Sequence, residues 1–241
     1  MKEVRYFYVP QASLTDMLPD DEALHAIRVL RLHEQDEIVL MDGDGIFYDA
    51  VITSTKAKHC KYEIVRSMPQ NKTWKGHLHL AIAPTKMMDR MEWMAEKATE
   101  IGFDELSFLN CSFSERKVIR VDRIEKIVVS AMKQSRKAWK PLVNDMENFK
   151  KFVSEERSGK KFIAHCYNEI PRIDFFETLQ QTLCVDDNIT VLVGPEGDFS
   201  IDEVRLAIEN GFTSISLGQS RLRTETAGLA AVMMMNLVNR L

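Results

Sequence analysis

Short apolar runs alternate with amphipathic helical stretches through residues 77–241, and this alternation limits the chain to few folds. The clearest unit is residues 189–209, where ITVLV ends in the glycine loop GPEGDF and a helix signal follows at once. In that signal Ser200 stands three residues before Glu203, which is the spacing of a capping box. Strands that alternate with helices form a mostly parallel sheet with helices on both faces. The sequence therefore predicts an α/β domain over residues 77–241.

Further segments of this region fit the same alternation. Other strands are expected at 77–84, 106–110, 162–166 and 213–218. Other helices are expected at 85–102, within 115–140, at 175–183 and at 224–241. Apolar residues in the helix at 85–102 recur every three or four positions, at Met87, Met91, Met94, Ala98 and Ile101. They predict one buried helix face rather than a cofactor motif, and Gly102 is expected to end that helix.

Residues 1–68 have a different, β-rich pattern. Strands are expected at 5–9, 36–41, 45–53 and 62–66, with hairpin-turn residues at 42–45. A short helix is expected between the first two strands. Several short strands around one helix predict a small barrel. Because residues 69–76 are polar and contain proline and glycine, we interpret them as a linker, with domains at 1–68 and 77–241.

The composition argues against several classes of protein. The chain has 241 residues, of which 45% are hydrophobic and 28% charged, as in ordinary globular proteins. No apolar run has the length of a signal peptide or a membrane span. The cysteines form no Cys-x-x-Cys motif and stand at Cys60, Cys111, Cys166 and Cys184. We therefore expect a cytoplasmic protein with reduced thiols, no metal and no membrane partner.

Charge is distributed unevenly along the chain. The whole sequence has a net charge of −4, which argues against general nucleic-acid affinity. Residues 115–140, however, hold nine lysines and arginines against three acids, whereas residues 141–211 hold seven against fourteen. Such segregation can present a basic face to phosphate groups. A solvated helix surface explains the same pattern, so both interpretations stay open.

Two loops that follow strands carry residues suited to ligand binding. They are GPEGDF at 194–199 and GQSRLRTET at 218–226, and both should open at the same edge of a parallel sheet. Glycines let the backbone approach a ligand closely, and backbone groups can bind a purine edge without charged side chains. Neither loop matches the phosphate-binding pattern GxxxxGKS, and no GxGxxG follows a strand.

Side chains at the end of the second loop can also be explained by helix capping, without any ligand. Thr224 or Thr226 can cap the following helix, and Glu225 can be a first-turn acid that interacts favourably with the helix dipole. Arg221 and Arg223 have no obvious packing role in the loop. These two arginines are therefore harder to explain without a ligand.

Four motifs together resemble a known family. They are HAIRVLRL at 25–32, PTKMMDRMEWMAEKATEIG at 84–102, GPEGDFS at 194–200 and SLGQSRLRTETA at 216–227. In this order they are similar to the bacterial 16S rRNA (uracil-N3)-methyltransferases of the SPOUT superfamily, and the similarity extends over nearly the whole chain. GPEG is shared with other SPOUT enzymes, whereas LRTETA combined with KATEIG is specific.

The resemblance implies a PUA-like, RNA-binding β-barrel domain followed by a SPOUT-type, trefoil-knotted parallel sheet with helices on both faces. It also implies a homodimer with the active site near the dimer interface, S-adenosylmethionine as cofactor, and a decoding-centre uridine of 16S rRNA in the small ribosomal subunit as substrate. By position, the cofactor-binding residues are His165, Val193, Gly194, Pro195, Glu196, Gly197, Leu217, Gly218, Leu222, Arg223, Thr224 and Thr226.

Roles in the reaction follow from the chemistry of uracil N3, which must lose a proton before it accepts a methyl group. Arg223 and Arg136 are the candidates to stabilise the uracil anion, and Glu196 or Glu225 the candidates to accept the proton. The base must be unpaired or flipped out of its stack. The residues expected to bind RNA are Arg28, Arg31, Lys86, Arg116, Lys133, Arg136 and Lys137.

The chain departs from the family pattern at two places. The family commonly has Gln-Ser-Gly-Arg where this chain has Gln134, Ser135, Arg136 and Lys137, so either cation can replace the family arginine. Asp198 stands where a second glycine is usual, and we expect it to adopt the same left-handed backbone.

Two alternative functions remain open. One is a ribose 2′-O-methyltransferase of the same superfamily, acting on rRNA or tRNA, although such enzymes normally carry an Asn-Val-Ser-type motif where this chain has LRTETA. The other is a non-catalytic RNA-binding protein of ribosome assembly, although the intact loop glycines argue against a degenerate site.

Overall fold

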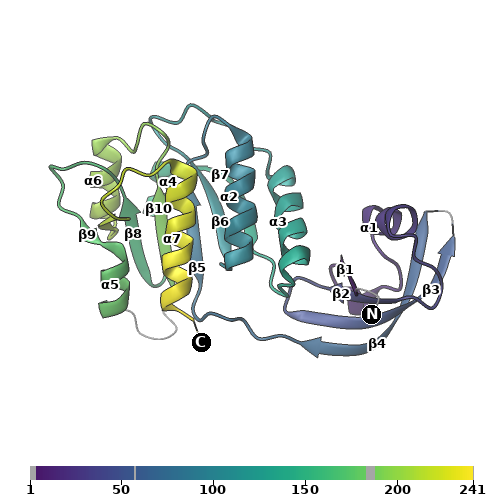
Figure 1. Ribbon diagram of the computed structural model, residues 1–241. Coiled ribbons are helices and arrows are strands. Elements are labelled where there is room, and N and C mark those ends of the chain that lie inside the picture. The colour runs from purple at the N-terminus through teal and green to yellow at the C-terminus, as the bar shows by residue number, and fades with distance from the viewer. Residues whose placement is uncertain (1–3, 57, 183–187, 241) are drawn as a thin grey trace. The chain divides into compact units, whose positions relative to one another are not determined.

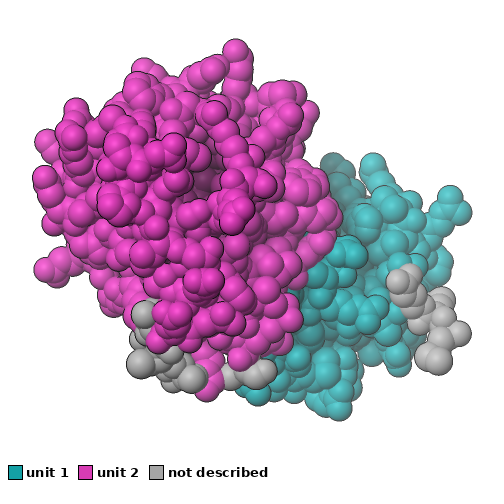
Figure 2. Space-filling view, turned by 60° about the vertical axis from the view of Figure 1, so that its left-hand side comes forward, with its two compact units in different colours: residues 1–72, 129–140 teal, residues 73–128, 141–241 magenta. Residues whose placement is uncertain are grey.

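The computed structural model describes residues 4–56, 58–182 and 188–240, and the chain divides into two compact units (Figure 2). Unit 1 comprises residues 1–72 and 129–140, and unit 2 comprises residues 73–128 and 141–241. Cys184 and the last residue of the helix expected at 175–183 lie outside the described residues.

Unit 1 is built on a four-stranded sheet in the order β1-β2-β3-β4. The strands are β1 (Arg5–Tyr8), β2 (Glu37–Met41), β3 (Ile46–Lys56) and β4 (His59–Pro69). β1 pairs with β2 in parallel, and the other neighbours pair antiparallel. The four expected strands are present. β3 and β4 are longer than their apolar runs because they pair with each other over their whole lengths.

The turn between β2 and β3 explains the two glycines at this place. Gly43 and Gly45 have φ values of 87° and 97°, in the left-handed region that glycine adopts without a steric penalty. The Asp42 carboxylate accepts hydrogen bonds from the backbone N–H groups of Asp44 and Ile46, at 2.8 and 3.0 Å. The hairpin turn predicted from the sequence is therefore confirmed.

A short helical region covers the sheet of unit 1. A 3-10 turn, η1 (Ala12–Leu14), precedes α1 (Asp20–Leu24), which continues as the π-helical segment η2 (His25–Val29). Its buried residues Ala23 and Ala26 join a core that includes Phe7, Leu40 and Ile52. The helix expected between the first two strands is thus present.

Helix α3 (Val121–Ser135) is divided between the two units, because its residues from 129 onward group with unit 1. Within unit 1, Lys133 Nζ lies 2.6 Å from Glu22 Oε1. Trp139 packs so closely on Gly45 that a Cβ at this glycine would collide with the indole ring. Nothing in the local sequence indicated this return of the chain to unit 1.

Unit 2 is built on a seven-stranded sheet in the order β7-β6-β5-β10-β8-β11-β9, with every neighbouring pair parallel (Figure 1). The strands are β5 (Leu78–Ile82), β6 (Glu105–Asn110), β7 (Leu142–Asn148), β8 (Lys160–Ala164), β9 (Ile173–Asp174), β10 (Ile189–Val193) and β11 (Thr213–Ser216). The parallel sheet predicted from the alternation is confirmed. The sequence did not predict β7, a polar edge strand, or β9, which has only two residues.

Helices cover both faces of this sheet, as predicted. They are α2 (Met88–Ile101), the unpredicted α4 (Phe149–Ser154), α5 (Phe175–Thr182), α6 (Ile201–Glu209) and α7 (Thr224–Val238). Helices α2, α5 and α7 lie on one face, and α4 and α6 lie on the other (Figure 1). Along β10, Val191 and Val193 join the core under α2 and α7, while Leu192 joins the core under α4 and α6.

The methionine-rich face of α2 is core, as the spacing indicated. Met91, Met94 and Ala98 are fully buried, whereas Met87 precedes the helix and is exposed. Gly102 ends the helix with φ 111° and donates its N–H to the Ala98 carbonyl at 2.8 Å. The predicted C-terminal cap is therefore confirmed.

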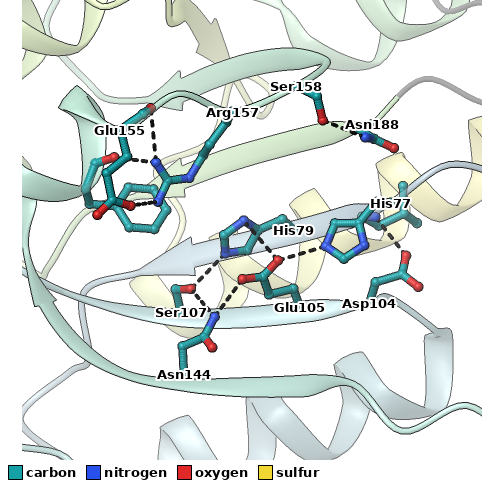
Figure 3. A network of polar contacts seen from close by, with 12 residues as sticks. His77, His79, Asp104, Glu105, Ser107, Asn144, Glu155, Arg157, Ser158 and Asn188 are labelled. Atoms are coloured by element: carbon teal, nitrogen blue, oxygen red, sulfur yellow. Dashed lines mark hydrogen bonds and ion pairs between the residues drawn. The ribbon is translucent and has the colours of Figure 1, made fainter. Parts of the chain in front are cut away.

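A polar network lies near the amino ends of β5, β6 and β7, away from the carboxyl edge (Figure 3). The Asn144 amide donates to Glu105 Oε1 at 2.6 Å and to Ser107 Oγ at 2.9 Å. Ser107 Oγ lies 2.8 Å from His79 Nε2, and His79 Nδ1 lies 3.6 Å from Glu105 Oε2. Because His79 is buried, these contacts satisfy polar groups that would otherwise be costly inside the sheet.

Candidate active site

Three loops at the carboxyl edge of the unit 2 sheet surround a cavity of about 1300 Å³. They follow β8, β10 and β11 and lie within residues 165–172, 194–199 and 217–223. These three strands are neighbours in a parallel sheet, and strand order reverses around β10. The carboxyl edge at such a reversal is where α/β sheets bind ligands.

The loop after β10 turns tightly. Asp198 donates its N–H to the Pro195 carbonyl at 2.9 Å, and its φ of 67° confirms the left-handed backbone expected from the sequence. Steric contact with neighbouring atoms, rather than a positive φ angle, explains why this loop has glycine at two positions. A Cβ at Gly194 would lie 3.0 Å from a backbone nitrogen, and a Cβ at Gly197 would lie 3.2 Å from Phe113 Cβ. The two glycines therefore let the loop pack closely against Phe199 and Phe113.

The helix that follows this loop begins with the predicted capping box. Ser200 Oγ accepts the Glu203 N–H at 3.2 Å, and the Glu203 carboxylate accepts the Ser200 N–H at 2.8 Å. Glu203 Oε1 also accepts the N–H of Ser112 at 2.7 Å. The capping box thus fixes both the start of α6 and the loop that follows β6.

Asp198 joins the loop after β10 to the loop after β8. Its Oδ2 accepts the Cys166 N–H at 2.8 Å. The Tyr167 hydroxyl donates to the Phe199 carbonyl at 2.6 Å and makes a second link. Burial, together with the Asp198 carboxylate, raises the pKa of the Cys166 thiol, so this cysteine stays protonated near neutral pH. Together these contacts hold the two loops as one wall of the cavity.

His165 is a buried polar group with an unused nitrogen. The expected strand at 162–166 ends at Ala164, so His165 lies in the loop, where it is 5% exposed. Its Nδ1 accepts the Tyr167 N–H at 3.3 Å, and burial lowers its pKa. The neutral ring therefore carries its proton on Nε2, which has no hydrogen-bond partner among the described residues. An unpaired buried donor is costly, which favours a ligand acceptor at this place.

The start of α7 corrects one expectation. The helix begins at Thr224, and Arg223 is its N-cap without a side-chain cap bond. Thr224 is already the first helical residue, so neither Thr224 nor Thr226 caps the helix. Glu225 lies in the first turn as expected, but it is buried, and its Oε1 lies 3.3 Å from Arg90 Nη1.

Most of the predicted site residues meet at this cavity. All of the predicted cofactor-binding residues except Thr226 line it. Of the predicted catalytic residues, Arg223, Glu196 and Glu225 also line it, whereas Arg136 belongs to unit 1. Glu196 Oε1 accepts the Lys86 N–H at 2.9 Å, which ties the loop after β10 to the chain that follows β5.

The predicted RNA-binding residues of unit 1 differ in their surroundings. Arg28 and Arg31 are exposed. Lys133 is paired with Glu22, as described above. The guanidinium Cζ of Arg136 lies 5.3 Å from the Tyr6 ring centroid, and the φ of Arg136 is 53°.

The predicted RNA-binding residues of unit 2 are tied to its loops. Lys86 is 75% exposed, and its Nζ lies 3.1 Å from Glu115 Oε2. Arg116 donates to the Thr85 carbonyl at 3.0 Å and to the Lys86 carbonyl. Arg116 therefore holds a loop beside the cavity, a role that its sequence position did not suggest.

Several residues that line the cavity were missed by sequence reasoning. They include Arg90 from α2 and Arg172, which donates to the His165 carbonyl at 2.7 Å. The polar stretch YNEIPR at 167–172 between a strand and a helix was the available signal. Arg90 carried no signal of its own, because its pairing with Glu225 joins residues far apart in the sequence.

Two further features concern metals and membranes. Within residues 4–56, 58–182 and 188–240, no group of three or more histidine, cysteine or acidic side chains could hold a metal ion. In the same residues, no helix is long and apolar enough to cross a membrane. Cys60, Cys111 and Cys166 are free thiols.

Comparisons with known proteins agree on one family. An RNA methyltransferase domain matches residues 72–236, and an RNA methyltransferase PUA domain matches residues 18–65. The ribosomal RNA small subunit methyltransferase E of Bacillus subtilis is 25% identical over 230 residues, which cover 90% of this chain and 88% of that protein.

Solved structures show the same relationship over the whole chain. A probable rRNA-methyltransferase from Porphyromonas gingivalis is 40% identical with a TM-score of 0.90, and the match covers 98% of both chains. The ribosomal RNA small subunit methyltransferase E from Neisseria gonorrhoeae, solved bound to S-adenosyl methionine, is 26% identical with a TM-score of 0.83 over 98% of both chains. The chain therefore belongs to the RNA methyltransferase family that includes the ribosomal RNA small subunit methyltransferases E, with a PUA-like N-terminal domain.

Proposed function

We propose that this protein transfers the methyl group of S-adenosylmethionine to N3 of a decoding-centre uridine in 16S rRNA of the small ribosomal subunit. The observation that carries the proposal is the cavity at the carboxyl edge of unit 2, where the predicted cofactor loops meet. The similarity to the rRNA methyltransferases from Bacillus subtilis and Porphyromonas gingivalis supports the reaction class.

The lining of the cavity fits S-adenosylmethionine. Gly194 and Gly197 bring the backbone of the loop after β10 to one wall, and His165 offers an unpaired buried Nε2–H donor. A backbone wall with one neutral donor suits the adenosine part of the cofactor, whose base and ribose carry acceptors and no charge. When bound, the cofactor supplies an electrophilic methyl group.

The side chains at the rim supply the remaining chemistry. Arg223 is exposed beside the cavity, so its guanidinium can stabilise the negative charge that develops on uracil oxygens. Glu225 is buried and paired with Arg90, so we assign it to holding the start of α7. Glu196 is exposed at the rim and is the better candidate to accept the N3 proton.

The backbone conformation of Arg136 helps to decide whether Arg136 or Lys137 stands at the place of the family arginine. Its φ of 53° lies in the region that glycine favours, which matches the place of the glycine in the family pattern Gln-Ser-Gly-Arg. By this criterion Lys137 occupies the place of the family arginine. We therefore infer that Lys137, rather than Arg136, takes the place of the family arginine, while Arg136 joins Arg28 and Arg31 in binding phosphates.

We also propose that the enzyme is a cytoplasmic homodimer with a trefoil-knotted catalytic domain. On α7, Met233 is 38% exposed and Leu237 is 43% exposed. This exposed apolar surface suits contact with a second copy of the chain. β10 inserts between β5 and β8, which precede it in the chain, and such an insertion is compatible with threading. Ribosomal subunits, the proposed substrate, are cytoplasmic.

The first test is the identity of the product. Purified protein is incubated with unmodified small ribosomal subunits and labelled S-adenosylmethionine, and the rRNA is digested to nucleosides for mass spectrometry. We expect labelled 3-methyluridine. A ribose-methylated nucleoside would replace the proposal with the 2′-O-methyltransferase alternative, and the absence of cofactor binding in calorimetry would support a non-catalytic protein.

The second test concerns Arg223. Arg223→Ala should reduce the rate of methylation by about a hundredfold or more, because loss of one donor to a developing anion costs about 3 kcal/mol. Cofactor affinity, measured by calorimetry, should change far less. Equal losses in rate and affinity would refute the role of Arg223 in stabilising the anion.

A further inference from the structure

Phe113 is a large aromatic residue that the fold leaves uncovered beside the cavity. It lies in the loop between β6 and α3 and is 52% exposed. Its Cβ lies 3.2 Å from the place that a Cβ on Gly197 would occupy, so the ring is next to the loop after β10. An exposed phenylalanine contributes little to the core, so its ring is available to another molecule.

The loop that carries Phe113 is held firmly on both sides of the residue. The Ser112 N–H donates to Glu203 Oε1 at 2.7 Å, and Glu203 is part of the capping box of α6. Ser114 Oγ accepts the Cys111 N–H at 3.0 Å, and the Ser114 N–H donates to the Cys111 carbonyl at 3.1 Å. The backbone at Phe113 is therefore fixed to the same structure that forms the cavity wall.

Cations flank this aromatic residue in the sequence and in the fold. Lys117 is exposed in the same loop. Arg116 binds the carbonyls of Thr85 and Lys86, which brings the loop after β5 to the loop of Phe113. The Lys86 side chain is 75% exposed there, and its Nζ lies 3.1 Å from Oε2 of Glu115 in the loop of Phe113. Aromatic faces accept stacked bases, and neighbouring cations accept the phosphates of the same strand.

We propose that Phe113 stacks against an unpaired nucleobase of the RNA substrate at the rim of the cavity. The inference rests on the proposed function and adds to it a residue that positions the RNA. A methyltransferase that acts on uracil N3 must hold an unpaired base, and recognition of unpaired RNA commonly uses aromatic stacking. The cations beside Phe113 favour RNA over a protein partner as the group that covers it.

The test compares three variants of the full-length protein. Phe113→Leu removes the ring and keeps an apolar side chain, Phe113→Tyr keeps the ring, and Val118→Ala is a matched control at an exposed apolar residue in the same loop. Affinity for unmodified small ribosomal subunits is measured by filter binding, cofactor affinity by calorimetry, and methylation by steady-state kinetics with subunits as the varied substrate.

Phe113→Leu should weaken the affinity for subunits and raise the KM for subunits by about tenfold, a typical effect of losing one stacked base. Its cofactor affinity should stay within twofold of the wild type. Phe113→Tyr and Val118→Ala should resemble the wild type in all three measurements. A purely structural role for the side chain would instead change cofactor affinity as well, which a role in RNA binding alone would not.

Several results would overturn the inference. They are unchanged subunit affinity in Phe113→Leu, an equal loss in Val118→Ala, a failure of Phe113→Tyr to restore binding, and a dissociated oligomer in Phe113→Leu with normal RNA affinity. Failure of the proposed function would be recognised in the wild type, by the absence of methylation. If the wild type binds subunits without methylating them, the binding measurements still decide the role of Phe113.

Discussion

Acid should destabilise this protein through His79, which lies deep in the polar network of the unit 2 sheet (Figure 3). The pKa of His79 is lowered from 6.5 to about 4, chiefly by burial; Glu105 opposes this change, and Arg157 and His77 add to it. Between these two pH values, the unfolded chain binds a proton at this residue and the folded chain does not. The stabilising contribution is therefore complete above about pH 6.5 and is lost as pH falls towards 4.

The size of this effect follows from the two pKa values. One pKa unit corresponds to about 1.4 kcal/mol, so the drop from 6.5 to about 4 corresponds to about 3 kcal/mol in total. About 2 kcal/mol of this should be lost already at pH 5. The pKa of Glu105 is lowered to about 2, chiefly by its hydrogen bond from His77, so the contribution of Glu105 is lost only below about pH 4.5.

The assay is urea unfolding, followed by circular dichroism at pH 7.5, 6 and 5, for the wild type and for His79→Gln. Glutamine can still hydrogen-bond to Ser107 but cannot titrate in this range. The wild type should lose about 2 kcal/mol more than the variant between pH 7.5 and 5. The comparison removes the contribution of His165, whose pKa is also lowered by burial. Equal losses in the two proteins would refute the reasoning.

Three further substitutions test local features of the site and its support. Ser200→Ala removes half of the capping box of α6 and should lower the free energy of unfolding by about 1 kcal/mol in urea titrations, and an unchanged value would contradict the cap. Gly228→Val places a Cβ 2.8 Å from Ile82 Cδ1 and should lower stability by about 1–3 kcal/mol, with a smaller loss in Gly228→Ala. Thermal unfolding checks this pair, and equal losses would count against a steric cause. Asp198→Gly keeps the left-handed backbone but removes the bond to the Cys166 N–H, so affinity for S-adenosylmethionine in calorimetry should fall. Wild-type affinity in this variant would show that the link between the two loops is dispensable.

Features that depend on neighbouring residues could be predicted from the sequence. The turn at Gly43 and Gly45, the cap at Gly102 and the left-handed Asp198 all follow from the backbone preferences of one residue type. The capping box at Ser200 depends on a partner only three residues away. The parallel sheet followed from the alternation of strands and helices, because such a chain has few ways to bury both faces of a sheet.

The cavity itself was predictable only in part. Loops after parallel strands must open at the same edge, so the loops at 194–199 and 218–226 were expected to meet. The order of the strands in the sheet could not be predicted from local sequence. Because β8 lies between β10 and β11, the loop of His165 lies between the two predicted loops. The short strand β9 and the polar edge strand β7 were missed because pairing, rather than an apolar run, stabilises them.

Contacts between distant residues were decided by the tertiary structure alone. Arg90 and Glu225 meet only because α2 and α7 pack side by side on the same face of the sheet. The segment at 129–140 belongs to unit 1, where its tryptophan packs on the glycine at position 45. Phe113 lies against Gly197 of the loop after β10, and Glu203, some ninety residues later, holds the loop that carries it. Local propensity specifies turns, caps and periods, whereas burial and pairing across the whole chain select which of these local pieces become neighbours.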